Sequence, residues 1–429
     1  MDVQRFHRCL WVLLAAGLLL RLVLIVRSPG VAPDIASLHL VADLFLADPL
    51  AVYDINVATE MQSAANRWPY PPGLLPVVGA VDVAAGLSGI SFERLVRVVF
   101  VAADLAIALL VRHALAARGA TAHAQLAAVA LVALGPCFFF ISAVHGQIDA
   151  VAWLPALAAV LLWDARRDRP RALGAGLLLG LAVAVKTTPL VLVLALLASA
   201  RSRREAFTLV GATVAVPALA LAPFLLAAPE GLSALGGYRG IGGRGGLTLL
   251  VQPELALLQL SGVIPELSGM TEFLLDHTAL VLAPPLLLVA AALRYRRTPA
   301  PVAAVVVVLT FYVFSAVVLP QYFLWVVPFL LVAGFLRTAT LLQLALLPVL
   351  VAIYLNLLDP VRPEPIRLGR DLVLYGYVPL VAAITAGFAV GIVVLLRRPT
   401  APPGLSSDWP AAPMTRSRRR AERRAAVPR

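Results

Sequence analysis

The chain has 429 residues, of which 61% are hydrophobic and only 14% are charged, with a formal net charge of +12. Soluble domains carry about 45–50% apolar and about 25% charged residues, so a water-soluble globular protein is excluded. The positive charge does not indicate nucleic-acid binding, because the arginines cluster at the ends of apolar runs, as in the cytoplasmic loops of membrane proteins. Cys9 and Cys137 are the only cysteines, so no disulfide framework is expected.

Apolar stretches of about 18 residues or more recur along the chain and predict an all-α, polytopic membrane bundle. The positive-inside rule places the basic clusters in the cytoplasm, so an even number of crossings must separate neighbouring clusters. Two short helices meeting near Lys186–Pro189 satisfy this rule within 172–200. The count is about twelve transmembrane helices with both termini inside, in the plasma (inner) membrane. The other expected spans are 9–26, 95–111, 121–143, 148–165, 207–228, 277–293, 301–318 and 323–336, with two more after Arg337.

Two segments are expected to lie outside the spans. Residues 28–94 form an extracytoplasmic loop with amphipathic surface helices, and its apolar part 72–88 is interfacial because it is short and contains Pro76 and Asp82. Residues 399–429 are rich in Pro and Arg and predict a disordered basic cytoplasmic tail near anionic lipid. Residues 1–398 are taken as one transmembrane domain.

The first outer loop offers a candidate base. Asp34 follows Pro33 shortly after the first span, where a carboxylate can accept a proton from a hydroxyl of a substrate arriving from outside. An N-cap for the helix that follows is the alternative interpretation of Asp34. Asp43, Asp48 and Asp54 are rivals for the catalytic role.

A polar turn at His145–Asp149 lies between two expected spans on the same side of the membrane. Its donors and acceptors suit sugar hydroxyls, and we expect the same of Tyr70 in the first outer loop and of Gln321 and Tyr322 at the turn between two later spans. A metal is not expected, because His and Asp four residues apart lack a third ligand nearby. The candidate sugar- or acceptor-binding residues are Tyr70, His145, Gln147, Asp149, Gln321 and Tyr322.

Lys186 is the only lysine among 35 basic residues and lies between two apolar helices. An ammonium there costs at least about 2.5–3.5 kcal/mol on insertion scales, so it needs a partner, for which a lipid phosphate is suitable. The alternative is a residue that snorkels to the interface. Three arginines are further candidate contacts of the phosphate, namely Arg239, Arg244 and Arg362. The first two lie in the Gly-rich stretch 236–246, for which a flexible lid is the alternative interpretation.

Five segments, Pro33–Asp34, Tyr70–Leu75, His145–Ala150, Gly180–Leu190 and Pro320–Pro328, occur in an order that resembles the GT-C superfamily of integral-membrane glycosyltransferases. The nearest types are the polyprenyl-phosphate-mannose-dependent mannosyltransferases, namely GPI mannosyltransferase I and its bacterial relatives. The resemblance, over about residues 8–336, implies inverting sugar transfer with Asp34 as general base and the lipid phosphate as leaving group.

The resemblance also implies the partners: a polyprenyl-phosphate-linked sugar donor, a glycolipid or glycan acceptor and the lipid bilayer. The second acid of the DxD-like pair of the GPI enzyme is missing here, since Asp34 is followed by Ile35 and Ala36, so neither a metal nor a cofactor is expected. Arabinofuranose is the alternative to mannose. A secondary transporter or lipid flippase, and an inactive partner subunit, are the alternatives to an enzyme.

Overall fold

The computed structural model describes residues 1–58, 67–165, 169–233, 235, 240, 242–263, 265–358 and 366–397. All regular elements in these ranges are helical, which confirms the all-α prediction. The elements in chain order are α1 (Val3–Arg27), α2 (Ala32–Ala47), α3 (Asp54–Ala58), η1 (Pro72–Leu74), α4 (Leu75–Ser88), α5 (Phe92–Ala117), α6 (Ala122–Ala133), α7 (Pro136–Phe138), η2 (Phe139–His145), α8 (Asp149–Asp164), α9 (Arg169–Val185), η3 (Thr188–Val191), α10 (Leu192–Ala198), α11 (Arg203–Ala227), α12 (Pro229–Ser233), α13 (Leu247–Val251), α14 (Leu255–Leu260), α15 (Gly269–Asp276), α16 (Thr278–Arg296), α17 (Ala300–Phe314), η5 (Pro320–Leu324), α18 (Val326–Val332), α19 (Leu336–Leu358), α20 (Arg370–Leu372), η6 (Val373–Tyr377) and α21 (Val378–Arg397).

Within the described ranges, 6 helices are long and apolar enough to cross a membrane, which indicates a multi-pass membrane protein. They are Val3–Arg27, Ala122–His145, Arg203–Ala227, Thr278–Arg296, Leu336–Leu355 and Arg370–Arg397. Several of the other expected spans correspond to shorter apolar helices, namely Arg171–Val185, Thr188–Ala198, Ala300–Phe314 and Pro320–Val332. The count of about twelve crossings therefore stays a prediction.

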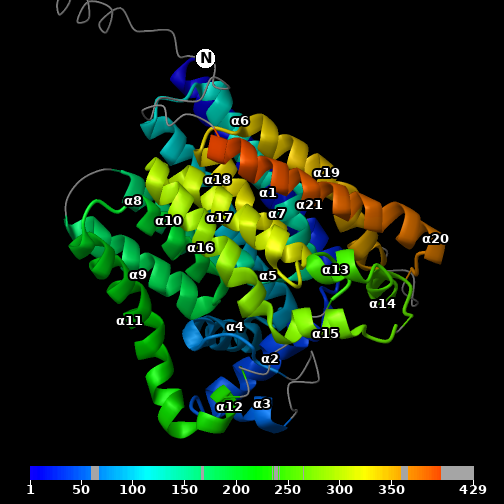
Figure 1. Ribbon diagram of the computed structural model, residues 1–429. Helices are drawn as coiled ribbons and strands as arrows, with labels where there is room; N and C mark the ends of the chain where they lie inside the picture. The colour runs from blue at the N-terminus through cyan, green and yellow to red at the C-terminus, as the bar shows by residue number, and fades with distance from the viewer. Residues whose placement is uncertain are drawn as a thin grey trace, which may run out of the picture.

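The predicted break within 172–200 is confirmed. Helix α9 ends at Val185, the 3-10 turn η3 follows with Pro189 inside it, and α10 begins at Leu192. Lys186 therefore lies at the carboxyl end of α9. Helices α9 and α11 lie side by side on one flank of the bundle (Figure 1).

Helices α2, α3, α4 and α12 gather at the end of the bundle opposite the N-terminus (Figure 1). Helix α2 buries Ile35, Leu38 and Val41 at helical spacing, so one face packs on the bundle. Between α3 and α12, a Cβ at Gly231 would lie 2.2 Å from the carbonyl oxygen of Tyr53, so only glycine allows this close approach. The elements expected in the first outer loop therefore form one compact cap.

Buried arginines hold the irregular backbone inside the bundle. The Arg97 guanidinium donates to the carbonyl oxygens of Ile25 (3.1 Å), Ser28 (2.9 Å) and Ala143 (3.0 Å), at the end of α1 and within η2. Carbonyl groups at an interrupted helix lack intrahelical partners, and in a membrane water does not replace them. Arg97 therefore joins α1, α5 and η2 where α2 begins.

A second buried arginine, Arg21, pairs with Asp104 at 3.2 Å and also donates to the carbonyl oxygen of Val132 at 2.9 Å.

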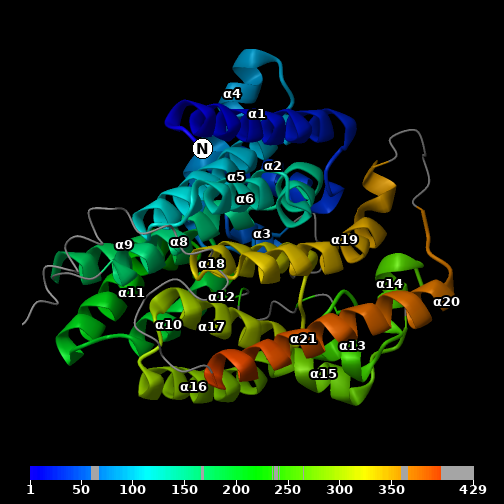
Figure 2. The same cartoon turned by 90° about the horizontal axis from the view of Figure 1, so that it is seen from above.

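Figure 2 shows α1 on one flank of the molecule and α16 and α21 on the other, with α18 and α19 between them. This arrangement brings α19 into the middle of the bundle, where it contacts η2.

Candidate active site

Asp34 lies in the first turn of α2, with Pro33 beside it and Val31 as the N-cap residue. The Val31 N–H donates to the carbonyl oxygen of His145 at 2.9 Å, which fixes the start of the helix to the end of η2. The Asp34 side chain is 34% exposed, so part of the carboxylate is open to a substrate. Asp34 is not the N-cap residue; the sequence-based alternative is therefore wrong.

The turn at 145–149 is built by an unusual helix end. The π-helix η2 ends at His145, Gly146 adopts φ 86°, and α8 begins at Asp149. The positive φ favours glycine at this position, and a Cβ there would also displace the end of the Ile35 side chain, 2.5 Å away. Such π-helical turns occur frequently at functional sites.

His145 connects Asp34 to the bundle interior. Its Nε2 lies 2.8 Å from Asp34 Oδ2, its Nδ1 lies 2.5 Å from the Tyr354 hydroxyl, and Gln147 Nε2 approaches His145 Nε2 at 3.3 Å. Burial favours a higher pKa for Asp34, but its interactions with His145, with Arg244 and with Gln147 outweigh the effect of burial. The pKa of Asp34 therefore lies below its ordinary value, and the carboxylate is ionised at neutral pH.

A second cluster surrounds Lys186. Its ammonium donates to both carboxylate oxygens of Asp149, at 2.9 and 3.0 Å, and Trp325 Nε1 donates to Asp149 Oδ1 at 2.6 Å. The rings of Tyr70, Tyr322 and Trp325 lie 5.6, 5.4 and 5.8 Å from Lys186 Nζ. Lys186 is 4% and Asp149 0% exposed, so the pair is buried. The partner that the sequence argument requires for Lys186 is supplied by the chain itself.

One turn therefore serves both clusters. His145 at its start binds Asp34, and Asp149 at its end binds Lys186. The sequence predicts that His145, Gln147 and Asp149 act together, and the structure brings them together with Tyr70 and Tyr322. The contacts of His145 and Asp149, however, are to protein side chains rather than to an open cavity.

Arg244 is brought into the same region, because its charge acts on Asp34. Its carbonyl oxygen accepts a hydrogen bond from the Tyr377 hydroxyl at 2.8 Å. The glycines that follow approach the segment after α17: a Cβ at Gly246 would lie 2.7 Å from the carbonyl oxygen of Ala316. The loop is therefore held against the bundle at this point.

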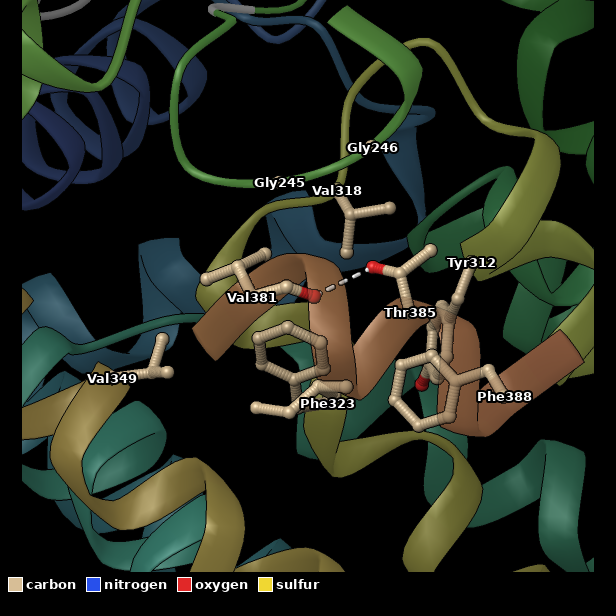
Figure 3. Close-up of a pocket in the computed structure, with 10 residues that line it drawn as sticks. Gly245, Gly246, Tyr312, Val318, Phe323, Val349, Val381, Thr385 and Phe388 are labelled. Atoms are coloured by element: carbon tan, nitrogen blue, oxygen red, sulfur yellow. Dashed lines mark hydrogen bonds between the residues drawn. The ribbon is translucent and has the colours of Figure 1, made fainter. Parts of the chain in front are cut away.

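Beside this loop lies a narrow apolar pocket between α17, α19 and α21 (Figure 3). Gly245 and Gly246 lie along one side of it, and the rings of Phe323 and Phe388 point into it. The Thr385 hydroxyl, also in the lining, donates to the Val381 carbonyl oxygen at 2.9 Å. The pocket is too small to hold more than a water-sized group.

Of the three remaining candidate residues, Gln321 lies among the described residues. Gln321 is buried, and its Oε1 is an acceptor with no hydrogen-bond partner among the described residues. Buried unpaired acceptors are rare and call for an explanation such as a ligand or water. Arg239 and Arg362 lie outside the described residues, as does the tail 399–429.

One group of side chains on α2 and α4 has the composition of a metal site. His39, Asp43 and Asp82 have ligand atoms within 4.8 Å of one another, and His39 Nε2 lies 3.2 Å from Asp82 Oδ1. His39 follows Asp34 by five residues, about 140° around the helix, so it points away from the carboxylate that His145 binds. This group is separate from the site around Asp34.

The sequence did not predict Tyr354 as a residue of the site. It also did not predict that His145 pairs with Asp34 and Asp149 with Lys186. A tyrosine within the long apolar run 336–358 was the only available signal for Tyr354. For Lys186, the requirement of a partner was correctly derived, but spacing along the chain does not reveal that Asp149 is adjacent in space.

The fold defines a multi-pass helical membrane protein with an ionised carboxylate held at one end of the bundle. A sequence model of glycosyltransferase family 87 matches residues 68–320, more than half of the chain. The chain belongs to this family, a GT-C-like family of membrane glycosyltransferases, and is therefore a glycosyltransferase. The match covers His145–Asp149 and Lys186 but not Asp34. Among curated proteins, none matches the chain.

Proposed function

We propose that the protein transfers a sugar, with mannose favoured and arabinofuranose the alternative, from a polyprenyl-phosphate carrier to a lipid-linked or cell-envelope glycan. The transfer takes place at the extracytoplasmic face of the membrane. The observation that carries this proposal is Asp34, an ionised and partly exposed carboxylate fixed by His145 at the edge of the bundle.

In the proposed reaction Asp34 accepts the proton of an acceptor hydroxyl while the hydroxyl oxygen attacks the anomeric carbon of the donor sugar. The bond from that carbon to the phosphate oxygen breaks, and polyprenyl phosphate leaves with the electron pair. The configuration at the carbon inverts, and the proton on Asp34 passes to water. A lowered pKa suits this role, because the ionised carboxylate is the form that acts.

Arg244, Arg239, Arg362 and Lys186 are the proposed contacts of the donor phosphate. Arg244 has the best support, because its charge already acts on Asp34. Lys186 has three donors and gives two of them to Asp149, so one N–H is left for a ligand.

Tyr70, Gln147, Gln321 and Tyr322 are the proposed contacts of the sugar or acceptor. The half-buried rings of Tyr70 and Tyr322 can stack on a sugar ring, and the unpaired Gln321 Oε1 can accept from a hydroxyl. His145 and Asp149 belong to the same site, and their contacts favour a supporting role through Asp34 and Lys186.

For the membrane arrangement we propose about twelve crossings, both termini in the cytoplasm and location in the inner membrane. The tail 399–429 then lies near the cytoplasmic leaflet as a basic, disordered segment.

Replacement of Asp34 by Asn tests the proposal, because it removes the base while keeping size and hydrogen-bonding capacity. Turnover with polyprenyl-phosphate-mannose should fall by about 10²-fold or more. The control is Asp48→Asn, an exposed acid at the end of the same helix, which should keep wild-type turnover. Near-normal turnover in purified, folded Asp34→Asn protein would contradict the assignment.

A further inference from the structure

Beyond Asp34 itself, the hydrogen-bond chain behind it ends at a residue with no direct access to substrate. Tyr354 on α19 is 1% exposed, its hydroxyl lies 2.5 Å from His145 Nδ1, and its ring stacks on Phe140 at 5.7 Å between centroids. We infer that Tyr354 is a positioning residue, whose hydroxyl donates to His145 Nδ1 and keeps the imidazole proton on Nε2, facing Asp34.

The direction of each hydrogen bond follows from the inventory of donors. An ionised carboxylate only accepts hydrogen bonds, so at 2.8 Å the Nε2 atom of His145 carries the proton that Asp34 accepts. The Gln147 amide, 3.3 Å from the same nitrogen, then donates to Asp34 and not to His145. In a neutral imidazole the other nitrogen is then an acceptor. The hydroxyl of Tyr354 is the group placed to donate to it.

The opposite tautomer would be incompatible with a general base. With the proton on Nδ1, the Nε2 lone pair would face Asp34 Oδ2 at hydrogen-bond distance, which is stable only when Asp34 is protonated. A protonated Asp34 cannot accept the proton of an acceptor hydroxyl. Tyr354 therefore acts on the reaction through His145, by favouring the one neutral tautomer in which Asp34 remains a base.

A backbone contact of His145 supports its role in holding Asp34, the role through which Tyr354 acts. The His145 carbonyl oxygen binds the Val31 N–H, so main chain and side chain of the same residue both hold the first turn of α2. The charged and titratable groups that act on Tyr354, besides Asp34, are Arg244, Asp149 and Tyr377. These groups are the same in wild type and in Tyr354→Phe, so they do not account for a difference between the two proteins.

The test is Tyr354→Phe, which keeps the ring that stacks on Phe140 and removes only the hydroxyl. This inference rests on the proposed function, so one readout is independent of turnover. In protein labelled with 15N in its 6 histidines, the His145 signals, assigned by their loss in His145→Gln, report which nitrogen carries the proton. Wild type should show the proton on Nε2, and Tyr354→Phe should show a mixture of the two tautomers.

The kinetic readout is the pH profile of kcat. Loss of the Tyr354 hydroxyl weakens the hydrogen bond that lowers the pKa of Asp34, so the acid limb should move up by about 0.5–1 pH unit and kcat should fall about tenfold. In a His145→Gln background the same change should have almost no further effect, because the two residues act as one unit. Tyr53→Phe, which also removes a buried hydroxyl bond, should leave the position of the acid limb unchanged.

A wild-type His145 with its proton on Nδ1, or fully additive effects of Tyr354→Phe and His145→Gln, would overturn the inference. Absence of transfer by wild type with every polyprenyl-phosphate sugar would instead count against the proposed function. The nitrogen signals would still decide the role of Tyr354 in that case.

Discussion

Removal of the Lys186 side-chain charge should destabilise the fold before it affects any ligand. Asp149 is 0% exposed, and in Lys186→Met the side-chain hydrogen bond left to it among the described residues is the one from Trp325 Nε1. Breaking a buried pair by removing one partner costs about 3–5 kcal/mol, because an uncompensated charge stays in the interior. The two short contacts of Lys186 Nζ with Asp149, at 2.9 and 3.0 Å, place this pair in that class.

Removing both charges should reverse most of the loss. In Lys186→Met combined with Asp149→Asn, the amide oxygen still accepts from Trp325 while neither ion remains, so we expect at least half of the lost stability to return. Asp149→Asn alone leaves the ammonium near three rings, which attract a cation by about 2 kcal/mol when desolvated, so it should be less harmful than Lys186→Met alone.

Thermal unfolding in detergent, followed by tryptophan fluorescence, measures these changes. Trp325 contacts the pair and stacks on Trp153 at 4.7 Å, so its emission reports the local environment. A Lys186→Met protein that unfolds at the wild-type temperature would refute the argument from the buried pair. Binding of polyprenyl phosphate to the folded double variant then measures whether Lys186 is also a phosphate ligand, as the sequence predicts: unchanged affinity would remove it from the donor site.

Two further predictions concern the turn and the topology. Gly146→Ala should lower both the unfolding temperature and turnover, because alanine is strained at φ 86° and its Cβ would displace the Ile35 side chain. Gly86→Ala, where nothing lies within 4 Å, is the neutral control, and equal effects in both would contradict this reasoning. In a cysteine-free background, Ser91→Cys should react with an impermeant maleimide from outside and Ser202→Cys should not; labelling of the latter from outside would overturn the paired short helices of 172–200.

Local sequence patterns predict the elements that are determined by residues close together in the chain. The proline in Lys186–Pro189 predicts the break between α9 and α10, because proline removes a helical hydrogen bond. The polar turn at 145–149 is likewise visible, since it interrupts two apolar runs. The count of crossings is less accessible, because short helices such as α10 and α18 do not have the length that hydropathy alone recognises.

The pairing of side chains depends on tertiary contacts and could not be predicted. Asp34 and His145 are separated by 111 positions and His145 and Tyr354 by 209, and periodicity carries no information over such distances. The residue types were nevertheless informative: an acid, a histidine and a lone lysine in an apolar chain each require a partner. The sequence therefore predicts that partners exist, and the fold determines which residues they are.

The attachment of α2 to η2 has a mechanical consequence. Because the start of α2 is fixed at its backbone and at Asp34, the outer segment cannot swing away like a hinged cover without breaking both links to His145. We therefore expect the base to keep its place when substrates bind, and the backbone amides at the start of α2 to exchange with deuterium as slowly as those of the bundle. Substrate entry must then depend on motion elsewhere, and the rate of sugar transfer becomes separable from the rate of opening.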